Sequence, residues 1–231
     1  MSAKRDAGSI KLLGGRLCLD FVNTVHCYGC DEIGEYLNNY QDLIDWSRHV
    51  GSMTSGEANR LTLKSAEHSG EAKRVHLRAI ELREIIYGIF CSILDGTFQA
   101  EKNLTAFNEY LSDTMALSKI VKTADGFDWD MTANTDRLDG ILSPVIRSTA
   151  DCLISEEWRN IKKCADPTCG WLFLDVSRNH SRRWCDMRDC GNRAKASRFY
   201  KKKKGTKSAK PSFQAPPRSS RSKSNIRRHL L

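Results

Sequence analysis

The sequence predicts a mainly α-helical N-terminal domain with a small β-hairpin, followed by a treble-clef-like zinc finger made of a β-hairpin and a helix. Two observations indicate this class. Apolar residues recur at three- and four-residue steps through much of the first 155 residues, as on the buried face of a helix. Four cysteines then stand in two pairs nearer the C-terminus, Cys164 with Cys169 and Cys185 with Cys190.

The clearest predicted helix covers residues 71–94. Its apolar stripe repeats with the helical period, and Asp95-Gly96 supplies a C-terminal stop. The stripe consists of Val75, Ala79, Leu82, Ile86, Ile89 and Ile93, widened by Ile85 and Phe90.

Three further helices are predicted from weaker patterns. Two cover residues 39–50 and 104–117, and the third begins with a Ser143 cap followed by Pro144 at the first helical position. A fresh cap at Ser155 predicts one more helical turn over residues 158–163. The inner side of the third helix is expected to carry Val145, Ile146, Thr149, Leu153 and Ile154.

The hairpin of the N-terminal domain is predicted where the apolar period changes. Residues 119–122 and 127–131 flank Asp125-Gly126, which is a common two-residue turn between strands. This hairpin interrupts the otherwise helical pattern.

Two polar features interrupt the apolar run near the N-terminus. For Asp20 and Asn23 we favour a buried hydrogen-bond network or a helix cap over a ligand pocket, because polar groups among apolar neighbours need partners. For Gly14-Gly15-Arg16 we favour a turn over an anion-binding loop, because the fuller glycine spacing of a phosphate loop is missing.

The cysteine spacing predicts a metal site. The pattern is C-x4-C, then fifteen residues, then C-x4-C. Two close pairs separated by a short hairpin suit a tetrahedral zinc ion with sulfur ligands at about 2.3 Å, and we favour this over four unrelated cysteines. Because all four predicted ligands, Cys164, Cys169, Cys185 and Cys190, are thiolates, we expect one closed, structural Zn2+ site with no position for a catalytic water.

Short local signals complete the predicted finger. Residues 166–168 form a turn, residues 171–174 have strand propensity, and residues 183–184 return toward Cys185. A helix follows Cys190 with no breaker before Gly205. Since about forty residues cannot build a sufficient core, we expect zinc to supply most of the finger's folding energy.

Residues 164–200 contain Cys-Gly-Trp-Leu-Phe-Leu-Asp, Arg-Arg-Trp-Cys and Cys-Gly-Asn-Arg-Ala-Lys, and this stretch resembles the CGNR zinc finger family. Gly-Gly-Arg-Leu-Cys-Leu-Asp-Phe-Val-Asn-Thr at residues 14–24 resembles the opening of the ABATE domain. The resemblance implies a bacterial stress-response transcription regulator whose finger binds DNA. It also implies an N-terminal domain that senses a small-molecule signal or mediates assembly, a homodimer through this domain being one option.

The sequence thus predicts four segments. They are a flexible N-terminus (1–9), a helical ABATE-like domain (10–155), a CGNR-type finger (156–204) and a disordered basic tail (205–231).

Charge is divided unevenly along the chain. Residues 191–231 hold 14 Lys and Arg residues and no acidic residue, which leaves 23 basic against 28 acidic residues in residues 1–190. A basic end on an acidic body is typical of polyanion binding, so we expect DNA as the partner. RNA and a protein partner are alternatives. A further alternative is that the basic tail only keeps the protein soluble. RNA is less favoured than DNA, because the sequence shows no obvious group of exposed aromatic residues on which single-stranded bases could stack. The predicted nucleic-acid contacts are Arg178, Arg182, Arg183, Arg193, Lys195, Arg198, Lys201 and Lys202.

Other classes of protein find little support. We expect no enzyme, because the sequence lacks nucleophile-elbow, zinc-protease and phosphate-loop motifs. We expect a cytoplasmic protein without a membrane partner, because no apolar run reaches about 18 residues and nine cysteines do not form a disulfide framework. His26, Cys27 and Cys30 offer three soft ligands without a fourth, so ordinary thiols are favoured over a second metal site. His180 is expected to face solvent or a phosphate.

Overall fold

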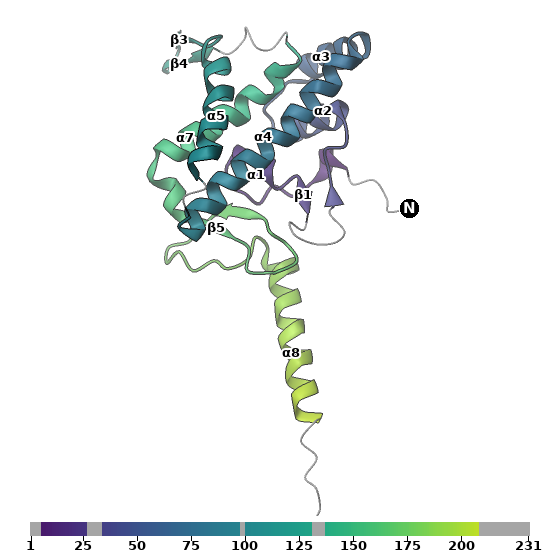
Figure 1. Ribbon diagram of the computed structural model, residues 1–231, viewed down its shortest axis with the longest axis vertical. Coiled ribbons are helices and arrows are strands. Elements are labelled where there is room, and N and C mark those ends of the chain that lie inside the picture. The colour runs from purple at the N-terminus through teal and green to yellow at the C-terminus, as the bar shows by residue number, and fades with distance from the viewer. Residues whose placement is uncertain (1–5, 27–33, 98–99, 131–136, 208–231) are drawn as a thin grey trace, which may run out of the picture. The chain divides into compact units, whose positions relative to one another are not determined.

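The computed structural model describes residues 6–26, 34–97, 100–130 and 137–207, without the side chains of Ala100 and residues 201–207. The predicted class is confirmed, since helices dominate and the strands form small antiparallel pairs (Figure 1). The helices are α1 (Leu17–Val22), α2 (Tyr40–His49), α3 (Ser55–Glu67), α4 (Ser69–Asp95), α5 (Ala100–Met115), α7 (Ser143–Ile154) and α8 (Asn192–Lys207).

Strands pair only with near neighbours in the chain. The pairs are β1 (Val25–His26) with β2 (Gly34–Glu35), β3 (Lys119–Thr123) with β4 (Gly126–Asp130), and β5 (Ile161–Lys163) with β6 (Leu172–Leu174). Short single turns are the 3-10 helices η1 (Ala7–Ser9), η2 (Asp139–Leu142) and η3 (Glu156–Asn160), and the π-helical turn η4 (Met187–Gly191).

The chain divides into two compact units. Residues up to Ala194 form one unit, which holds both the helical part and all four finger cysteines, and the second unit begins at Lys195. At the other end of the chain, Ala7 within the predicted flexible segment is buried in η1.

Helix α4 is the centre of the first unit and confirms the strongest prediction. It contacts α1, α2, α3 and α5 (Figure 1). The stripe residues Val75, Ala79, Leu82, Ile86 and Ile89 are buried. Gly96 ends the helix with φ 64°, a left-handed conformation that glycine adopts without a steric penalty.

Two other predicted helices are also confirmed. Helix α2 is capped by Asn39, whose side chain accepts from the Asp42 N–H, and it turns Tyr40, Leu43 and Ile44 into the core. Helix α5 begins four residues earlier than the predicted residue 104.

Two helices escaped the sequence analysis. Helix α1 buries Cys18, Leu19, Phe21 and Val22 at 0% exposure, but its 6 residues are too few to display a helical period. Helix α3 buries few apolar residues, but Thr54 and Glu57 form a capping box that is readable in the sequence.

Several details after residue 120 differ from the prediction. Leu142 rather than Ser143 precedes the first turn of α7, because η2 leads directly into the helix. Ile154 is 85% exposed rather than inward, and residues 158–163 form the end of η3 and then β5 rather than a helical turn.

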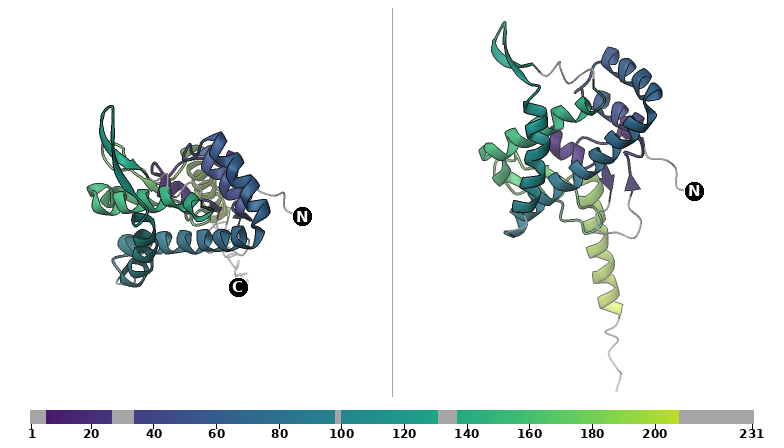
Figure 2. Two further views of the ribbon diagram at one scale, coloured as in Figure 1. Left: turned by 90° about the horizontal axis from the view of Figure 1, so that it is seen from above. Right: turned by 45° about the horizontal axis from the view of Figure 1, so that its top comes forward.

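The hairpin β3–β4 exists, but its turn is shifted by one residue. Thr123 pairs with Gly126, so the turn residues are Ala124 and Asp125. The hairpin projects from the helices (Figure 2), which leaves Ile120 65% exposed and Phe127 78% exposed.

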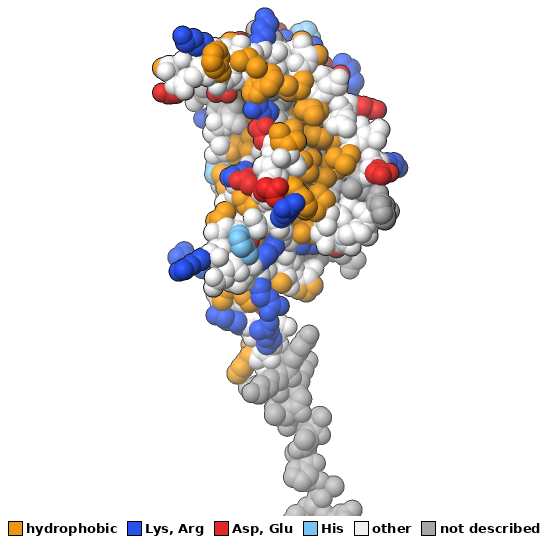
Figure 3. All heavy atoms as spheres, turned by 90° about the vertical axis from the view of Figure 1, so that its left-hand side faces the viewer, with side chains coloured by type: hydrophobic (Ala, Val, Ile, Leu, Met, Phe, Trp, Pro, Cys, Tyr) orange, Lys and Arg blue, Asp and Glu red, His pale blue; other side chains and the backbone are white. Residues whose placement is uncertain are grey.

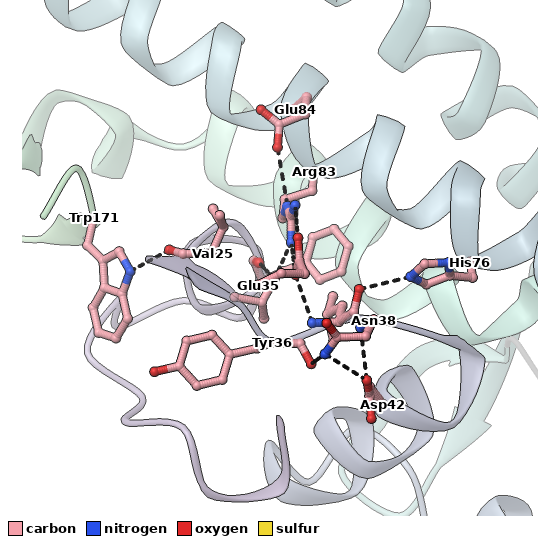
Figure 4. A network of polar contacts seen from close by, with 12 residues as sticks. Val25, Glu35, Tyr36, Asn38, Asp42, His76, Arg83, Glu84 and Trp171 are labelled. Atoms are coloured by element: carbon pink, nitrogen blue, oxygen red, sulfur yellow. Dashed lines mark hydrogen bonds and ion pairs between the residues drawn. The ribbon is translucent and has the colours of Figure 1, made fainter. Parts of the chain in front are cut away.

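A buried arginine fixes the β1–β2 pair to α4. Arg83 is 3% exposed, and its guanidinium donates to both carboxylate oxygens of Glu35 at 2.8 and 2.7 Å (Figure 4). A further N–H of Arg83 donates to Thr24 Oγ1 at 3.3 Å. This bidentate pair therefore anchors the strand beside the finger's Trp171, whose indole N–H donates to the Val25 carbonyl at 2.7 Å.

We expect Glu35→Gln to destabilise the protein, because it leaves the buried Arg83 charge without its carboxylate. Breaking a buried ion pair costs about 3–5 kcal/mol of unfolding free energy. Because the Glu35 side chain is 29% exposed, we expect a loss at or below the lower end of this range. Thermal denaturation measures it. Glu84→Gln is the matched control, since this 50% exposed partner contacts the same arginine at 3.3 Å; equal losses for the two variants would contradict the assignment.

None of the helices in the described part of the chain combines the length and apolar character needed to cross a membrane.

Candidate metal centre

The first cysteine loop (residues 164–169) follows β5 and is shaped by Asp166. The Cys164 N–H donates to the Trp171 carbonyl at 2.8 Å, which extends the β5–β6 ladder to the first cysteine. The Asp166 carboxylate accepts from the Thr168 N–H at 3.0 Å, and the Cys169 N–H donates to the Asp166 carbonyl at 3.0 Å. This predicted turn therefore points both cysteines to one side.

The second cysteine loop (residues 185–190) is built in a similar way. Asp186 accepts from the Arg188 N–H at 2.8 Å and so caps η4, the turn that carries Cys190. Gly191 packs against this turn, because an added Cβ would lie 2.5 Å from Met187 Sδ. The Cys185 N–H donates to Cys164 Sγ at 3.4 Å and joins the two loops.

The four sulfur atoms lie together in the arrangement that a tetrahedral ion requires. Within the described residues, Cys164, Cys169, Cys185 and Cys190 are the group suited to hold a metal, and their ligand atoms all lie within 4.8 Å of one another. Cys185 Sγ lies 3.6 Å from both Cys169 Sγ and Cys190 Sγ. Four sulfurs at about 2.3 Å from one ion are about 3.8 Å apart, so this donor set fits zinc.

The buried thiols interact, so that the pKa of Cys164 falls whereas the pKa values of Cys169, Cys185 and Cys190 rise. Hydrogen bonds from Cys169, and then from Cys185, lower the pKa of Cys164 well below that of an ordinary thiol. All four thiols are free and buried. The thiolate form is the one that binds metal.

Family models match the chain in both of its predicted parts. Residues 15–156 match the ABATE model, described as "Putative stress-induced transcription regulator". The chain belongs to the ABATE family. Residues 160–203 match the CGNR zinc finger, so the four gathered cysteines identify the cofactor as one structural zinc ion. Neither family is an enzyme family, and no curated protein matches the chain.

The strand pairing of the ABATE protein's finger differs from the prediction. β6 pairs with β5, so one strand precedes the first cysteine loop and the other follows it. Residues 183–184 do not form a strand of this hairpin. Instead, the Arg183 carbonyl accepts from the Ala165 N–H at 2.8 Å. The pattern missed β5 because it is only three residues long and follows the 3-10 turn η3 directly.

The finger has no core separate from that of the helices, although the sequence predicted a module too small for a core of its own. Leu172, Phe173 and Leu174 of β6 are 0–4% exposed, and β6 packs against α1 of the N-terminal part. The hydrophobic core therefore runs continuously from the helices into the finger.

Asn23 joins the two parts and confirms the favoured interpretation of a buried network. Its side chain accepts from the Leu172 N–H at 2.9 Å and donates to the Leu172 carbonyl at 2.8 Å, as a neighbouring strand would. Asp20 accepts from the Gly14 N–H at 2.7 Å, and the Gly14 carbonyl accepts from the Leu174 N–H at 2.8 Å. Gly14-Gly15 is thus a turn packed against α1 rather than an anion site.

The predicted nucleic-acid contacts fall into different environments. Arg178 and Arg183 are exposed, as are Lys195 and Arg198 on α8. Lys201 and Lys202 belong to α8, which continues through Gly205, but their side chains lie outside the described residues.

Two of the predicted contacts are engaged within the finger. The Arg182 guanidinium stacks on Phe173 at 4.2 Å and donates to the carbonyls of Trp184, at 3.1 Å, and Cys185. Arg193 donates to Asp166 and to Cys190 Sγ. Sequence pattern alone did not reveal these roles, because they depend on how the two cysteine loops fold against each other.

The remaining candidates are placed as follows. His26 lies edge-on to Trp171, with ring centroids 6.2 Å apart, whereas Cys27 and Cys30 lie outside the described residues. His180 is exposed in the polar turn, and its Nδ1 lies 2.9 Å from the Asp175 carbonyl. Asn192 is the first residue of α8 and donates to the Arg188 carbonyl at 2.8 Å.

Asp175 is a structural residue that the sequence analysis missed. Its side chain is 0% exposed and accepts from Lys162 Nζ at 2.7 Å, the Ser177 N–H at 3.0 Å and the Arg182 N–H at 3.0 Å. Burial alone would raise the pKa of Asp175, but the Lys162 ammonium and these N–H donors together hold it well below its usual range. One carboxylate thus folds the polar turn that presents Arg178.

We expect Asp175→Asn to destabilise the finger, because the new amide places a donor against the Lys162 ammonium and the Arg182 N–H. Hydrogen bonds to charged groups contribute about 1.5–3 kcal/mol, so a loss of this size is expected in thermal denaturation. Asp151→Asn, which removes a 54% exposed partner of Arg147, should change stability by less than about 1 kcal/mol. A neutral effect of Asp175→Asn would rule out its role in the turn.

Proposed function

We propose that this ABATE protein is a zinc-dependent, DNA-binding transcription regulator of the bacterial cytoplasm, with no catalytic activity of its own. One observation carries the proposal: α8 begins two residues after the fourth zinc ligand, and over Asn192–Lys207 it holds eight basic residues and no acidic one. The metal ligands proposed are Cys164, Cys169, Cys185 and Cys190.

A helix of this kind suits the DNA major groove. Its 16 residues span about 24 Å, against a groove about 12 Å wide. Exposed arginine can read guanine bidentately, and lysine can hold phosphate. On the face shown in Figure 3, Lys and Arg side chains gather at the finger with no acidic side chain drawn among them.

The proposed contact set is narrower than the one predicted from the sequence. Arg182 and Arg193 are removed, because their guanidinium groups bond to the finger itself. The set that remains is Arg178, Arg183, Lys195, Arg198, Lys201 and Lys202, with residues 205–231 as the tail that adds phosphate contacts.

The N-terminal part, residues 10–155, is proposed to receive the signal or to mediate assembly, including a homodimer. Its firm attachment to the finger supports this role, because Asn23, Gly14 and Val25 all bond to finger residues. A structural change in α1 would therefore reach β6 directly.

We expect the double substitution Lys195→Glu and Arg198→Glu to weaken DNA binding strongly in gel-shift titrations with the zinc-loaded protein. The substitution also lowers the slope of log K against log salt by about 2, since each phosphate contact contributes about 0.9. Lys73→Glu with Arg74→Glu is the control, because it makes the same charge change on exposed positions of α4. Equal losses for both pairs, or a flat salt response of the unaltered protein, would contradict the proposal.

Single-stranded RNA is the second candidate, and exposed aromatic residues favour it. Phe199 and Tyr200 are 64% and 65% exposed, with ring centroids 6.0 Å apart, although the sequence offered no obvious stacking platform. Stacking of a base contributes about 1–3 kcal/mol. Phe199→Ala with Tyr200→Ala should leave duplex DNA binding intact and weaken single-stranded RNA binding only if this candidate is correct.

A further inference from the structure

Arg193, the arginine of the Cys-Gly-Asn-Arg run, bonds to the metal centre itself. Its terminal N–H group donates to Cys190 Sγ at 3.1 Å, and its Nε–H donates to Asp166 Oδ2 at 2.8 Å. One side chain from the first turn of α8 thus contacts a zinc ligand and the residue that shapes the first cysteine loop.

Asp166 is held in place for this contact. Its side chain is 6% exposed, and its other oxygen accepts from the Thr168 N–H and from the Thr168 hydroxyl at 2.8 Å. Asp166 therefore fixes the direction of the guanidinium.

The electrostatics of the centre call for a cation at this position. Four thiolates around a divalent ion leave a net charge of about −2 in a site where all four cysteines are buried. Uncompensated charge in a buried site is costly, and an arginine N–H donor on the sulfur offsets part of it. Arginine suits the position because its rigid fork reaches a sulfur and a carboxylate at once.

The same cysteine also lies beside a pocket. Cys190, which is itself buried, lines a pocket of about 370 Å3 together with Cys169, Cys185, Trp171 and Lys11. A reagent that enters this pocket approaches Cys190, so its rate of reaction reports on the contacts that hold this side chain.

We propose that Arg193 is a positioning residue of the zinc centre, which holds Cys190 as a thiolate ligand and ties the two cysteine loops together through Asp166. It is then not a base- or phosphate-reading residue. The assignment depends on the metal centre alone and stands or falls independently of DNA binding.

The test compares the full-length variants Arg193→Gln and Arg193→Lys with Arg188→Gln. Arg188 is an exposed arginine of the same cysteine loop, so the control makes the same charge change close to the metal. We expect Arg193→Gln to lose zinc to a colorimetric chelator with about 10–100-fold weaker affinity, as other outer partners of metal ligands do. The zinc affinity of Arg193→Lys should lie between those of Arg193→Gln and Arg188→Gln, because one ammonium cannot span the sulfur and the carboxylate.

Two readouts separate this role from general destabilisation. The 113Cd chemical shift of the cadmium-loaded protein should move in Arg193→Gln and Arg193→Lys, because a hydrogen bond to a ligand sulfur is altered, and should stay fixed in Arg188→Gln. Mass spectrometry should find Cys190 alkylated faster by N-ethylmaleimide in Arg193→Gln than the other three ligands. If Arg193→Gln does not fold, the cadmium shift and the Cys190 reactivity of the folded Arg193→Lys variant test the proposal instead.

The proposal is overturned if the Arg193 variants keep the zinc affinity, the cadmium shift and the Cys190 reactivity of the unaltered protein. Loss of DNA binding with an unchanged metal centre would likewise overturn it and return Arg193 to the nucleic-acid contacts. Metal loss in the Arg193 variants supports it, whether or not the unaltered protein binds DNA.

Discussion

Zinc removal is expected to lower the stability of the finger and of the helical part together, so that both still unfold in a single transition on heating. The four cysteines and the helices share one compact unit, and β6 is buried against α1 within a continuous core. Structural zinc contributes about 10–16 kcal/mol in small sites, whereas whole domains are stable by only about 5–15 kcal/mol. The loss of the ion should therefore lower the stability of α4 as well as that of the cysteine loops.

Circular dichroism at 222 nm measures this effect during thermal unfolding of zinc-loaded and chelated protein. The chelated protein should melt at a much lower temperature, with one cooperative step in both samples. Cys185→Ser should reproduce the effect, and Cys91→Ser, which alters a cysteine of α4 outside the metal centre, should not. An unchanged helical transition after complete metal removal would show that the two parts fold separately.

Asn23→Ala is expected to be the most damaging single substitution away from the cysteines. It leaves the buried N–H and carbonyl of Leu172 without partners, and each unpaired group costs about 1–3 kcal/mol. Asn23→Ala should therefore lower the melting temperature. It should also weaken the zinc affinity, because Leu172 lies in the strand that leads out of the first cysteine loop.

Chemical denaturation and chelator competition measure the two effects of Asn23→Ala. Asn108→Ala, an exposed asparagine of α5, is the matched control and should alter neither quantity. Asn23→Asp keeps the acceptor for the Leu172 N–H and loses the donor, so an intermediate loss is expected. A loss of helix stability with unaltered zinc affinity would show that Asn23 does not couple the two parts.

Elements with strong local signals were predictable from the sequence. Helix α4 has a long periodic stripe and a glycine stop, α2 has a capping asparagine, and the cysteine spacing fixes the metal, because each depends on residues close together in the chain. Helix α1 and strand β5 were not predictable, since the helix has only 6 residues and the strand only 3, too few to display a period.

The sequence by itself determined that this protein holds a zinc ion on four cysteines and ends in a strongly basic segment, because ligand spacing and charge are local properties of the chain. Only the tertiary structure decided that the finger shares its core with the helices and that Arg193 and Arg182 serve the finger. Those contacts join positions such as Asn23 and Leu172, 149 residues apart, and no local pattern encodes which distant partner a buried polar group will meet.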